Sequence, residues 1–420
     1  MRLHRLVLRD FRGFHRTVID FDKQLTVLVG ANGAGKTSVL DAIAILLDQY
    51  SARLLSTRAT ARRLSEYDAR ANTPETKIAL EVEEGGMSYR WSLAKQGARE
   101  RVLRPRSSEL DGLNQLVRFI ADSAEEEQYY LTDTSLPIYY DQRRALVDIP
   151  KRKTGSAKHN AHDAFVESRS NSGLDFRGFT YWFQERETEE LRIQRRDNDY
   201  KDPQLDTVRR AIKAATGLSE LSYSTVPPRG LTVRKGKVEL HIEQLSTGER
   251  TFLSLAGDLA RRLSMISSIS KDARLGSAIV LIDEIELHLH PRWQRKVMPW
   301  LMEAFPNCQF IVTTHSPQVV GEIGAHHLRV LEFSSRGSRI KKVAATRGRD
   351  SNFILASALG ADERSAEAQN ALEAVEIALS EGDLERAKDA LEAAASAIEG
   401  SAPEIAIAEA RIQRRTTRAK

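Results

Sequence analysis

The chain has 420 residues, and its 63 lysines and arginines outnumber its 58 aspartates and glutamates to give a formal net charge of +5. With 41% hydrophobic and 29% charged residues, the composition is that of a globular protein, and the length allows two or three domains. The one cysteine, Cys308, excludes a disulfide within the chain, and no apolar run is long enough to span a membrane. We therefore expect a soluble, cytoplasmic protein without a membrane partner.

The positive charge leaves the kind of partner open. A pI near 9.2 favours polyanions such as DNA or RNA. The near balance of basic and acidic residues is equally typical of a mixed, solvated surface. Composition alone does not choose between these two interpretations.

Two strands and a phosphate-binding loop are predicted near the N-terminus. Residues 2–21 alternate apolar and polar side chains around a turn at 11–14, which predicts two strands. A buried strand at 25–29 and a helix at 38–47 then flank residues 30–37, Gly-Ala-Asn-Gly-Ala-Gly-Lys-Thr, which match G-x-x-x-x-G-K-[ST]. An ordinary glycine-rich turn is the alternative, but the strand and helix on either side favour the phosphate-binding loop.

The residue types of this loop suit the phosphate chain of a nucleotide. Glycines let several backbone N–H groups converge on phosphate oxygens, and the following helix adds its positive dipole end. Lys36 supplies a positive charge for the β- and γ-phosphates, and the Thr37 hydroxyl is a candidate ligand for Mg²⁺. The predicted nucleotide-binding residues of this segment are Gly30, Asn32, Gly33, Ala34, Gly35, Lys36, Thr37 and Ser38.

The middle of the chain is predicted to hold a β-hairpin and several helices. Residues 77–82 and 87–93 alternate around a Glu-Glu-Gly-Gly turn, which is typical of an antiparallel hairpin laid against the nucleotide core. After the first helix, the arginines at 53–63 predict a basic helical stretch ending near 72–74. We expect further helices at 116–121, 176–196 and 205–215, strands at 136–140, 231–233 and 238–242, and a mobile basic loop at 151–161.

The segment 244–250, Gln-Leu-Ser-Thr-Gly-Glu-Arg, opens an apolar-periodic helix. Ser246 is placed to cap that helix, and Glu249 follows three residues later as in a capping box. Taken alone, the segment is therefore explained as a helix start. Its functional interpretation depends on the strands that follow.

Two buried strands deliver polar residues to one edge of the predicted sheet. The run 278–282 ends in Asp283 and Glu284, and the run 310–314 ends before His315. In α/β sheets the carboxyl ends of the strands carry the ligand, so Asp283 is expected near Mg²⁺ and Glu284 near the attacking water. His315 is a candidate contact of the γ-phosphate.

Taken together and in this order, the motifs resemble the ABC-type ATPases of the RecF, SMC and OLD branch. The resemblance rests on residues 30–37, 245–249, 279–284 and 314–317. It implies an α/β fold: a P-loop ATPase core with a mixed sheet, an antiparallel β subdomain and a helical insertion. It further implies ATP and Mg²⁺ as cofactors, Glu284 as general base, His315 as switch histidine and Asp283 as a metal ligand. It also implies a head-to-tail homodimer, across which Ser246 and Gly248 contact the γ-phosphate.

Two more residues are assigned through the resemblance. A glutamine at the end of a strand coordinates Mg²⁺ in the branch, and Gln142, just after 138–140, is the candidate. Arginines at the N-terminal turn of relatives touch the nucleotide, which makes Arg12 a further candidate. Two features depart from the common pattern of the branch. Thr247 stands in place of the first glycine of Leu-Ser-Gly-Gly. Residues 288–290 are His-Leu-His, which is either a metal site or the Leu-His-Pro sequence that the branch often carries at this position.

After residue 348 the composition shifts to Ala, Glu, Leu and Arg, which predicts a helical hairpin at 366–379 and 384–398 and a third helix from Pro403. This tail resembles those of Septu-type antiphage-defence ATPases, including relatives attached to retrons. It is either an oligomerisation or docking element or a hairpin that covers the core. The expected domains are 1–145 and 231–347 for the two parts of the ATPase core, 146–230 for the helical insertion, and 348–420 for the tail.

Three functions are consistent with the sequence. The first is a defence ATPase that controls a partner HNH nuclease, because no second acidic cluster after His315 provides a nuclease centre within the chain. The second is a RecF- or SMC-like repair ATPase that binds DNA directly, although no sustained heptad repeat supports an SMC protein. The third is a transporter subunit, which the separation of about two hundred residues between Lys36 and Ser246 disfavours.

Overall fold

The sheet that carries the predicted phosphate loop has six strands in the order β13-β12-β3-β11-β10-β6. Neighbours from β12 to β6 pair in parallel, whereas β13 pairs antiparallel with β12. The three central strands are completely buried, which explains their continuous runs of Val, Ile and Leu. The strands are β3 (Leu25–Val29), β6 (Leu136–Tyr140), β10 (Ala278–Ile282), β11 (Gln309–Thr313), β12 (Leu328–Ser334) and β13 (Gly337–Lys341).

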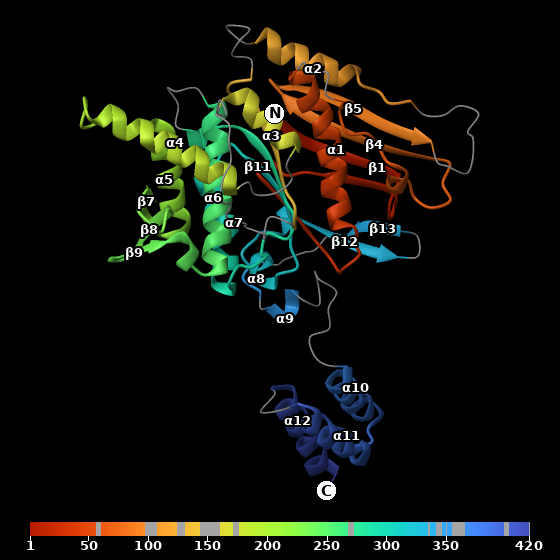
Figure 1. Ribbon diagram of the computed structural model, residues 1–420. Helices are drawn as coiled ribbons and strands as arrows, with labels where there is room; N and C mark the ends of the chain where they lie inside the picture. Colours follow the sequence, from red (N-terminus) through yellow and green to blue (C-terminus); the bar gives the residue numbers. More distant parts are fainter. Residues whose placement is uncertain are drawn as a thin grey trace. The chain divides into compact units, whose positions relative to one another are not determined.

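The computed structural model divides into two units, Met1–Ile354 and Leu355–Lys420 (Figure 1). None of the helices in its described part is long and apolar enough to cross a membrane. The structure describes residues 1–55, 60–96, 107–123, 131–142, 160–170, 176–267, 273–334, 337–341, 347–349, 351–354, 366–398 and 403–419.

A second, antiparallel sheet has the order β2-β1-β4-β5 and confirms the predicted β subdomain. The β4–β5 turn lies at Gly85 and Gly86, whose positive φ angles of 58° and 76° suit a tight hairpin turn. Trp91 of β5 is buried and donates a hydrogen bond from Nε1 to the Leu46 carbonyl of the first helix, at 3.1 Å. The strands are β1 (Arg2–Phe11), β2 (Phe14–Asp20), β4 (Glu75–Glu84) and β5 (Met87–Gln96).

The first helix, α1, follows β3 directly and contacts strands of both sheets. Figure 1 shows it between the β4–β5 hairpin and the six-stranded sheet. On the other side of the unit, α6 is buried from Thr251 to Ile266 and packs on α5. The helices are α1 (Lys36–Leu54), α2 (Asp111–Asp122), α3 (Ala161–Ser170), α4 (Phe176–Gln194), α5 (Pro203–Thr216), α6 (Thr247–Ile266), α7 (Pro291–Ala304), α8 (Pro317–Val320) and α9 (Ser351–Ile354).

A small third sheet, in the order β7-β8-β9, precedes α6. It contains the two strands predicted at 231–233 and 238–242 and one strand that the sequence analysis missed, since the polar run at 219–224 lacks a clear alternation. The strands are β7 (Ser219–Ser224), β8 (Gly230–Lys235) and β9 (Val238–His241).

The described part of the smaller unit consists of three helices around a core of its own, which confirms the predicted helical tail. Asp383 caps the second helix by accepting a hydrogen bond from the Arg386 N–H at 3.0 Å. The helices are α10 (Ala366–Glu381), α11 (Leu384–Ala397) and α12 (Pro403–Ala419), and the buried core is Val375, Ala378, Leu379, Ala387, Ala394, Ala408 and Ile412.

The predicted basic helical stretch after α1 is wrong in its described part. The helix ends at Leu54, and residues 60–65 are not helical. Side chains of α1 hold this segment instead: Asp48 accepts a hydrogen bond from the Arg62 N–H at 2.6 Å, and Gln49 donates one to the Arg62 carbonyl at 2.7 Å. Residues 151–159 of the loop predicted to be mobile lie outside the described residues.

Candidate active site

The loop between β3 and α1 has a backbone that requires glycine at three positions. Gly30, Gly33 and Gly35 have φ angles of 146°, 79° and 99°. A Cβ atom at Gly30 would lie 2.2 Å from the Leu331 carbonyl oxygen, and one at Gly35 would lie 2.8 Å from the Phe14 ring. The glycines therefore serve both the turn and its close packing.

Lys36 begins α1 and is buried, with its Nζ atom 2.9 Å from the Gly30 carbonyl oxygen and 3.0 Å from that of Ala31. Burial lowers the pKa of Lys36, while the charges of Asp283, Glu284 and Glu286 oppose that shift. The ammonium group is thus held over the loop, where phosphate oxygens can replace the carbonyl oxygens as its partners.

Thr37, the next residue, joins α1 to the carboxyl end of β10. Its Oγ1 donates a hydrogen bond to Asp283 Oδ2 at 2.9 Å, and the Asp283 side chain is almost fully buried. A threonine hydroxyl and a carboxylate at this separation are hard oxygen donors of the kind that Mg²⁺ prefers.

Thr313, which the sequence analysis did not single out, organises the end of β10. Its hydroxyl donates to Asp283 Oδ1 at 2.5 Å and accepts a hydrogen bond from the Glu284 N–H at 2.7 Å. The parallel register of β10 and β11 pairs Ile282 with Val312 and so places Thr313 there. No local sequence pattern marks this role, because it depends on the pairing of β11 with β10.

Gln142, assigned above as a candidate Mg²⁺ ligand, lies beside Glu284. The Gln142 Nε2 atom donates a hydrogen bond to Glu284 Oε1 at 3.0 Å. Strand β6 pairs with β10, and the Asp283 N–H donates to the Tyr140 carbonyl at 2.9 Å, which brings Gln142 to this edge. Glu284 has a φ of 49°, an uncommon value for a residue with a side chain.

His315 follows β11 and is anchored by a carboxylate that the sequence analysis also missed. Its backbone N–H donates to Glu286 Oε1 at 2.5 Å. Burial, together with the positive charge of Lys36, lowers the pKa of His315. His315 is therefore close enough to Lys36, Glu286 and Asp283 for their charges to act on its imidazole.

Arg12 lies at the turn between β1 and β2 and contacts α1 through Asp41, whose Oδ1 accepts a hydrogen bond from the Tyr139 hydroxyl at 3.2 Å. Its Nη1 atom is 2.6 Å from Asp41 Oδ2 and 3.5 Å from Ser38 Oγ. Its Nη2 atom is 2.9 Å from Asp68 Oδ1. The structure thus places Arg12 beside the first turn of α1, although neither Asp41 nor Asp68 was expected there.

Ser246 and Gly248 stand apart from this group. Ser246 caps α6 by accepting a hydrogen bond from the Glu249 N–H at 3.3 Å, and the predicted capping box is present. A Cβ atom at Gly248 would lie 2.8 Å from the His288 carbonyl oxygen. No hydrogen bond among the described residues joins Ser246 or Gly248 to residues 30–38 of the same chain.

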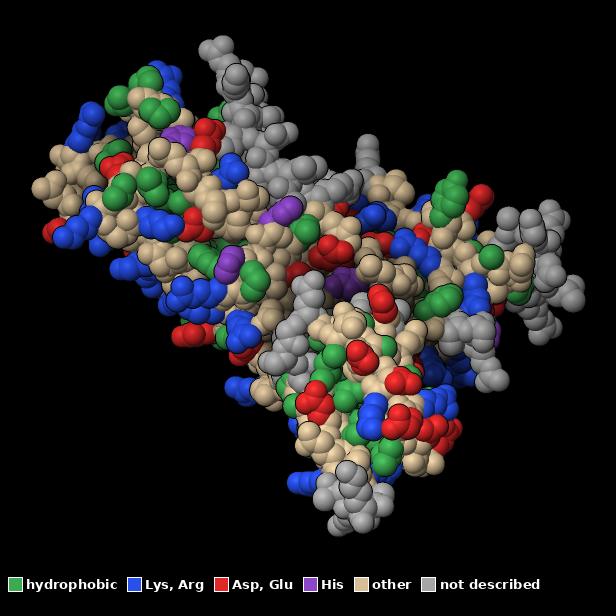
Figure 2. Space-filling model, turned by 90° about the horizontal axis from the view of Figure 1, so that it is seen from below, with side chains coloured by type: hydrophobic (Ala, Val, Ile, Leu, Met, Phe, Trp, Pro, Cys, Tyr) green, Lys and Arg blue, Asp and Glu red, His purple; other side chains and the backbone are tan. Residues whose placement is uncertain are grey.

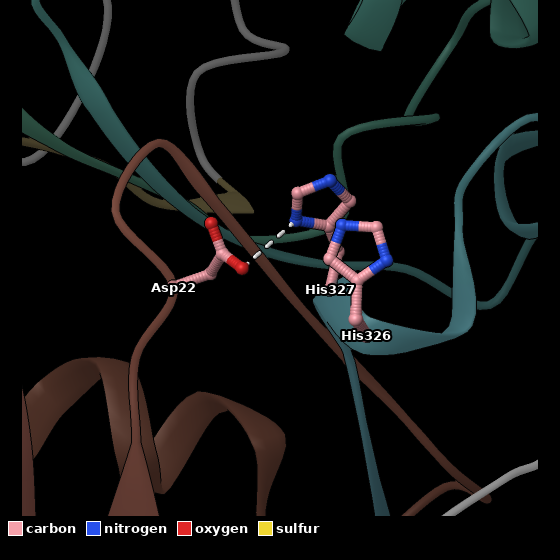
Figure 3. Close-up of side chains that lie close together, drawn as sticks. All are labelled: Asp22, His326 and His327. Atoms are coloured by element: carbon pink, nitrogen blue, oxygen red, sulfur yellow. Dashed lines mark ion pairs between the residues drawn. The ribbon is translucent and has the colours of Figure 1, made fainter.

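The His-Leu-His segment forms no metal-ligand cluster within the described ranges. The group of three potential ligands found there is Asp22, His326 and His327 (Figure 3). The His327 Nδ1 atom lies 3.0 Å from the Leu25 carbonyl oxygen and 3.5 Å from Asp22 Oδ2. Because a carbonyl oxygen only accepts hydrogen bonds, Nδ1 of His327 must carry the proton in this contact. We therefore interpret the cluster as a structural clamp that holds the start of β3.

The charges on the surface are mixed. Figure 2 shows basic side chains interleaved with acidic ones over the face that it presents. Basic residues near β8 are paired in part, since Arg234 lies 2.5 Å from Glu220 and Lys235 lies 2.7 Å from Glu249. The charged side chains visible in Figure 2 are therefore of both signs.

The chain matches known proteins over most of its length. It is 29% identical to "Retron Ec83 probable ATPase" of Escherichia coli, covering 84% of this chain and 75% of that protein. It is 24% identical to "Septu protein PtuA" of Bacillus thuringiensis, covering 78% and 76%. Among solved structures, the "SMC head domain from Thermotoga maritima" aligns with 82% of this chain and all of that chain, at 17% identity and a TM-score of 0.45.

The family model described as "AAA domain, putative AbiEii toxin, Type IV TA system" matches residues 25–321. That span begins at β3 and contains the phosphate loop, the α6 start, Asp283, Glu284 and His315. The chain therefore belongs to this family of AAA-domain proteins and is an ATPase.

Proposed function

We propose that the site binds ATP with Mg²⁺ and that each side chain gathered around the phosphate loop has a separate role. Lys36 and the N–H groups of residues 30–38 hold the β- and γ-phosphates, because the loop conformation and the helix start both favour anions. Thr37 and Asp283 supply oxygen ligands to the metal, with Gln142 as a third candidate. When bound, the metal neutralises charge on the phosphates during transfer.

Hydrolysis is assigned to Glu284 as general base, which takes a proton from the attacking water. Gln142 and Thr313 fix its position, one through the side chain at 3.0 Å and the other through the backbone at 2.7 Å. His315 is neutral at physiological pH, as its lowered pKa indicates, and can donate a hydrogen bond to the γ-phosphate.

We infer that the complete site needs two copies of the chain. Ser246 is exposed at the start of α6, and Gly248 lies in the same first turn, where N–H groups and the helix dipole favour an anion. Neither residue is bonded to the phosphate loop of its own chain. A head-to-tail homodimer would bring them to the γ-phosphate held by a second copy.

We further propose that the ATPase serves an antiphage defence complex and controls an HNH nuclease supplied by a partner chain. The proposal is supported by the similarity to a retron ATPase and a Septu protein over about four fifths of this chain. The separate helical unit, Leu355–Lys420, is the candidate docking or oligomerisation element.

The observation that carries the proposed chemistry is the meeting of Thr37, Asp283, Glu284 and Gln142 at one edge of the sheet. The test of the partner is affinity purification of tagged Glu284→Gln protein from its native host, with nuclease-treated controls and mass spectrometry. We expect a small HNH-type nuclease in stoichiometric amount.

Recovery of DNA and repair proteins without a nuclease would contradict the defence assignment and favour a RecF-like protein. That alternative also predicts that the purified chain alone binds DNA with a steep dependence on salt.

A further inference from the structure

Helix α1 is tied to the six-stranded sheet at two successive turns. The first tie is the hydrogen bond from Thr37 to Asp283 at the end of β10. Asp41 lies four residues after Thr37, on the same face of α1. Its Oδ1 atom accepts a hydrogen bond from the Tyr139 hydroxyl of β6 at 3.2 Å. The second tie therefore joins α1 to β6, the strand that pairs with β10.

The orientation of the Asp41 carboxylate is restricted because both of its oxygen atoms have a partner. Oδ2 lies 2.6 Å from Arg12 Nη1, and Oδ1 accepts from the Tyr139 hydroxyl. Arg12 is itself held by Asp68, which lies 2.9 Å from its Nη2 atom. Burial, together with the negative charges of Asp41 and Asp283, raises the pKa of Tyr139, so the phenol keeps its proton and is the donor. Asp41 is thus a fixed acceptor for Tyr139.

Strand β6 depends on such side-chain contacts because it stands at one end of the strand order. Among the described strands it pairs with β10 alone. Consecutive side chains of a strand point to opposite faces. Tyr139 accordingly donates to Asp41 of α1, whereas Tyr140, the last residue of β6, donates from its hydroxyl to Asp258 Oδ2 of α6 at 2.9 Å. The end of β6 is therefore held by a helix on each face of the sheet.

The end of β6 leads directly to the residue that contacts the proposed general base. Gln142 follows β6 by two positions, and its Nε2 atom donates to Glu284 Oε1 at 3.0 Å. The Tyr140 carbonyl accepts a hydrogen bond from the Asp283 N–H at 2.9 Å, which keeps the ends of β6 and β10 together. A shift of β6 away from α1 would therefore move Gln142 relative to Glu284 and to the proposed metal ligands.

We propose that Asp41 is a positioning residue for hydrolysis: through Tyr139 it sets where β6 ends, and so holds Gln142 beside Glu284. The inference rests on the proposed roles of Glu284 and Gln142 in ATP hydrolysis. Asp41 takes no part in the chemical step. Loss of its contact with Tyr139 slows turnover and leaves the phosphate loop, and with it the binding of ATP, intact.

The first test compares Tyr139→Phe with Tyr50→Phe in the full-length protein. Tyr50 is the matched control, because it is a buried tyrosine of α1 whose hydroxyl donates to the Ser135 carbonyl at 3.2 Å, next to the start of β6. Each variant loses one hydroxyl between α1 and the β6 segment, so urea denaturation should show similar losses of stability.

Turnover should separate the two variants. Phosphate release at saturating MgATP should fall about tenfold in Tyr139→Phe, because small displacements at a reacting site have large effects on rate. It should stay at the wild-type rate in Tyr50→Phe. Calorimetric titration should give the wild-type affinity for MgATP in both variants.

The second test asks whether the effect passes through Gln142. In a double-mutant cycle, the losses caused by residues that act through one another do not add. Gln142→Ala should slow phosphate release by itself, and Tyr139→Phe added to it should cause no further loss. Asp41→Ala should slow release at least as much as Tyr139→Phe, again with no further loss in the double variant. A role in stability alone would give independent losses in both cycles.

The opposing outcomes are distinct. Wild-type turnover in Tyr139→Phe, or an equal loss in Tyr139→Phe and Tyr50→Phe, would overturn the positioning role. Independent losses in the cycle with Gln142→Ala would overturn the route through Gln142. A loss of MgATP affinity as large as the loss of turnover would show that Tyr139 supports the phosphate loop instead. Wild-type turnover in both Gln142→Ala and Glu284→Gln would contradict the proposed chemistry itself, which separates the two proposals.

Discussion

The hydroxyl of Thr37 donates a hydrogen bond to the Asp283 carboxylate at 2.9 Å, across 246 positions of sequence. This contact joins the start of α1 to the end of β10, the two places where the sequence carries its phosphate-loop and acidic motifs. Since both side chains offer oxygen atoms of the kind that a divalent cation prefers, the two proposed metal ligands already lie side by side.

Replacing Lys36 with alanine should abolish the binding of ATP. The ammonium group is the positive charge that the loop itself supplies to the phosphates, and its removal also takes away a charge that attracts the carboxylates of Asp283, Glu284 and Glu286. Calorimetric titration with MgATP measures the effect, and circular dichroism checks folding. Lys23→Ala, at an exposed lysine outside the loop, is the control; retention of wild-type affinity in Lys36→Ala would contradict the role of Lys36.

Replacing Glu284 with glutamine should preserve ATP binding and lower turnover at least about 100-fold, because a general base typically contributes 10²–10⁴ in rate. The amide keeps the shape of the side chain and can still bond to Gln142. Phosphate release measures turnover, and size-exclusion chromatography with ATP should show a trapped dimer. Glu303→Gln on α7 is the exposed control, and hydrolysis at the wild-type rate in Glu284→Gln would remove Glu284 from the mechanism.

Thr313→Val should slow hydrolysis and destabilise the protein by about 1–3 kcal/mol, because it removes the hydroxyl that donates to the buried Asp283 Oδ1 and accepts from the Glu284 N–H. Thr313→Ser retains the hydroxyl and is the matched control. Chemical denaturation and phosphate release measure the two effects. Equal behaviour of the valine and serine variants would show that the hydroxyl does not position Glu284.

Much of this site was predictable from the sequence, because its main residues follow local patterns. The phosphate loop, Asp283 with Glu284, and His315 each come directly after a run of buried apolar residues. The roles of Thr313 and Asp68 were not predictable in that way. Thr313 acts through the register between β10 and β11, and Asp68 acts through a bond to Arg12, 56 residues away; neither relationship has a local signal.

The end of α1 shows the same limit of local patterns. Arginines favour helix, and residues 53–63 read as a basic continuation of α1. The structure ends the helix at Leu54 because Asp48 and Gln49 bond to the backbone of Arg62 and hold the chain beside α1. Tertiary contacts thus outweigh the helix propensity of these arginines, which is worth only a few tenths of a kcal/mol per residue.

The clamp at His327 should make stability depend on pH below about 6.5. Burial lowers the pKa of His327 from its ordinary value of 6.5, so the unfolded chain binds a proton more readily than the folded chain. Its contribution to stability is therefore complete above pH 6.5 and is lost as the pH falls toward the lowered pKa. Urea midpoints at pH 7.5, 6.5 and 5.5 should fall less in His327→Gln, whose amide can still donate to the Leu25 carbonyl; parallel curves would contradict this origin.

Ser246→Arg should block hydrolysis without weakening ATP binding, because its own phosphate loop is intact and only the contact to the neighbouring copy is lost. The decisive measurement is mixing, since Lys36→Ala lacks a working loop but keeps Ser246. A mixed dimer then has one complete site, made from the loop of the Ser246→Arg chain and the α6 start of the Lys36→Ala chain. Random pairing at equal amounts should restore about a quarter of the wild-type activity; mixtures as inactive as the separate variants would overturn the shared site.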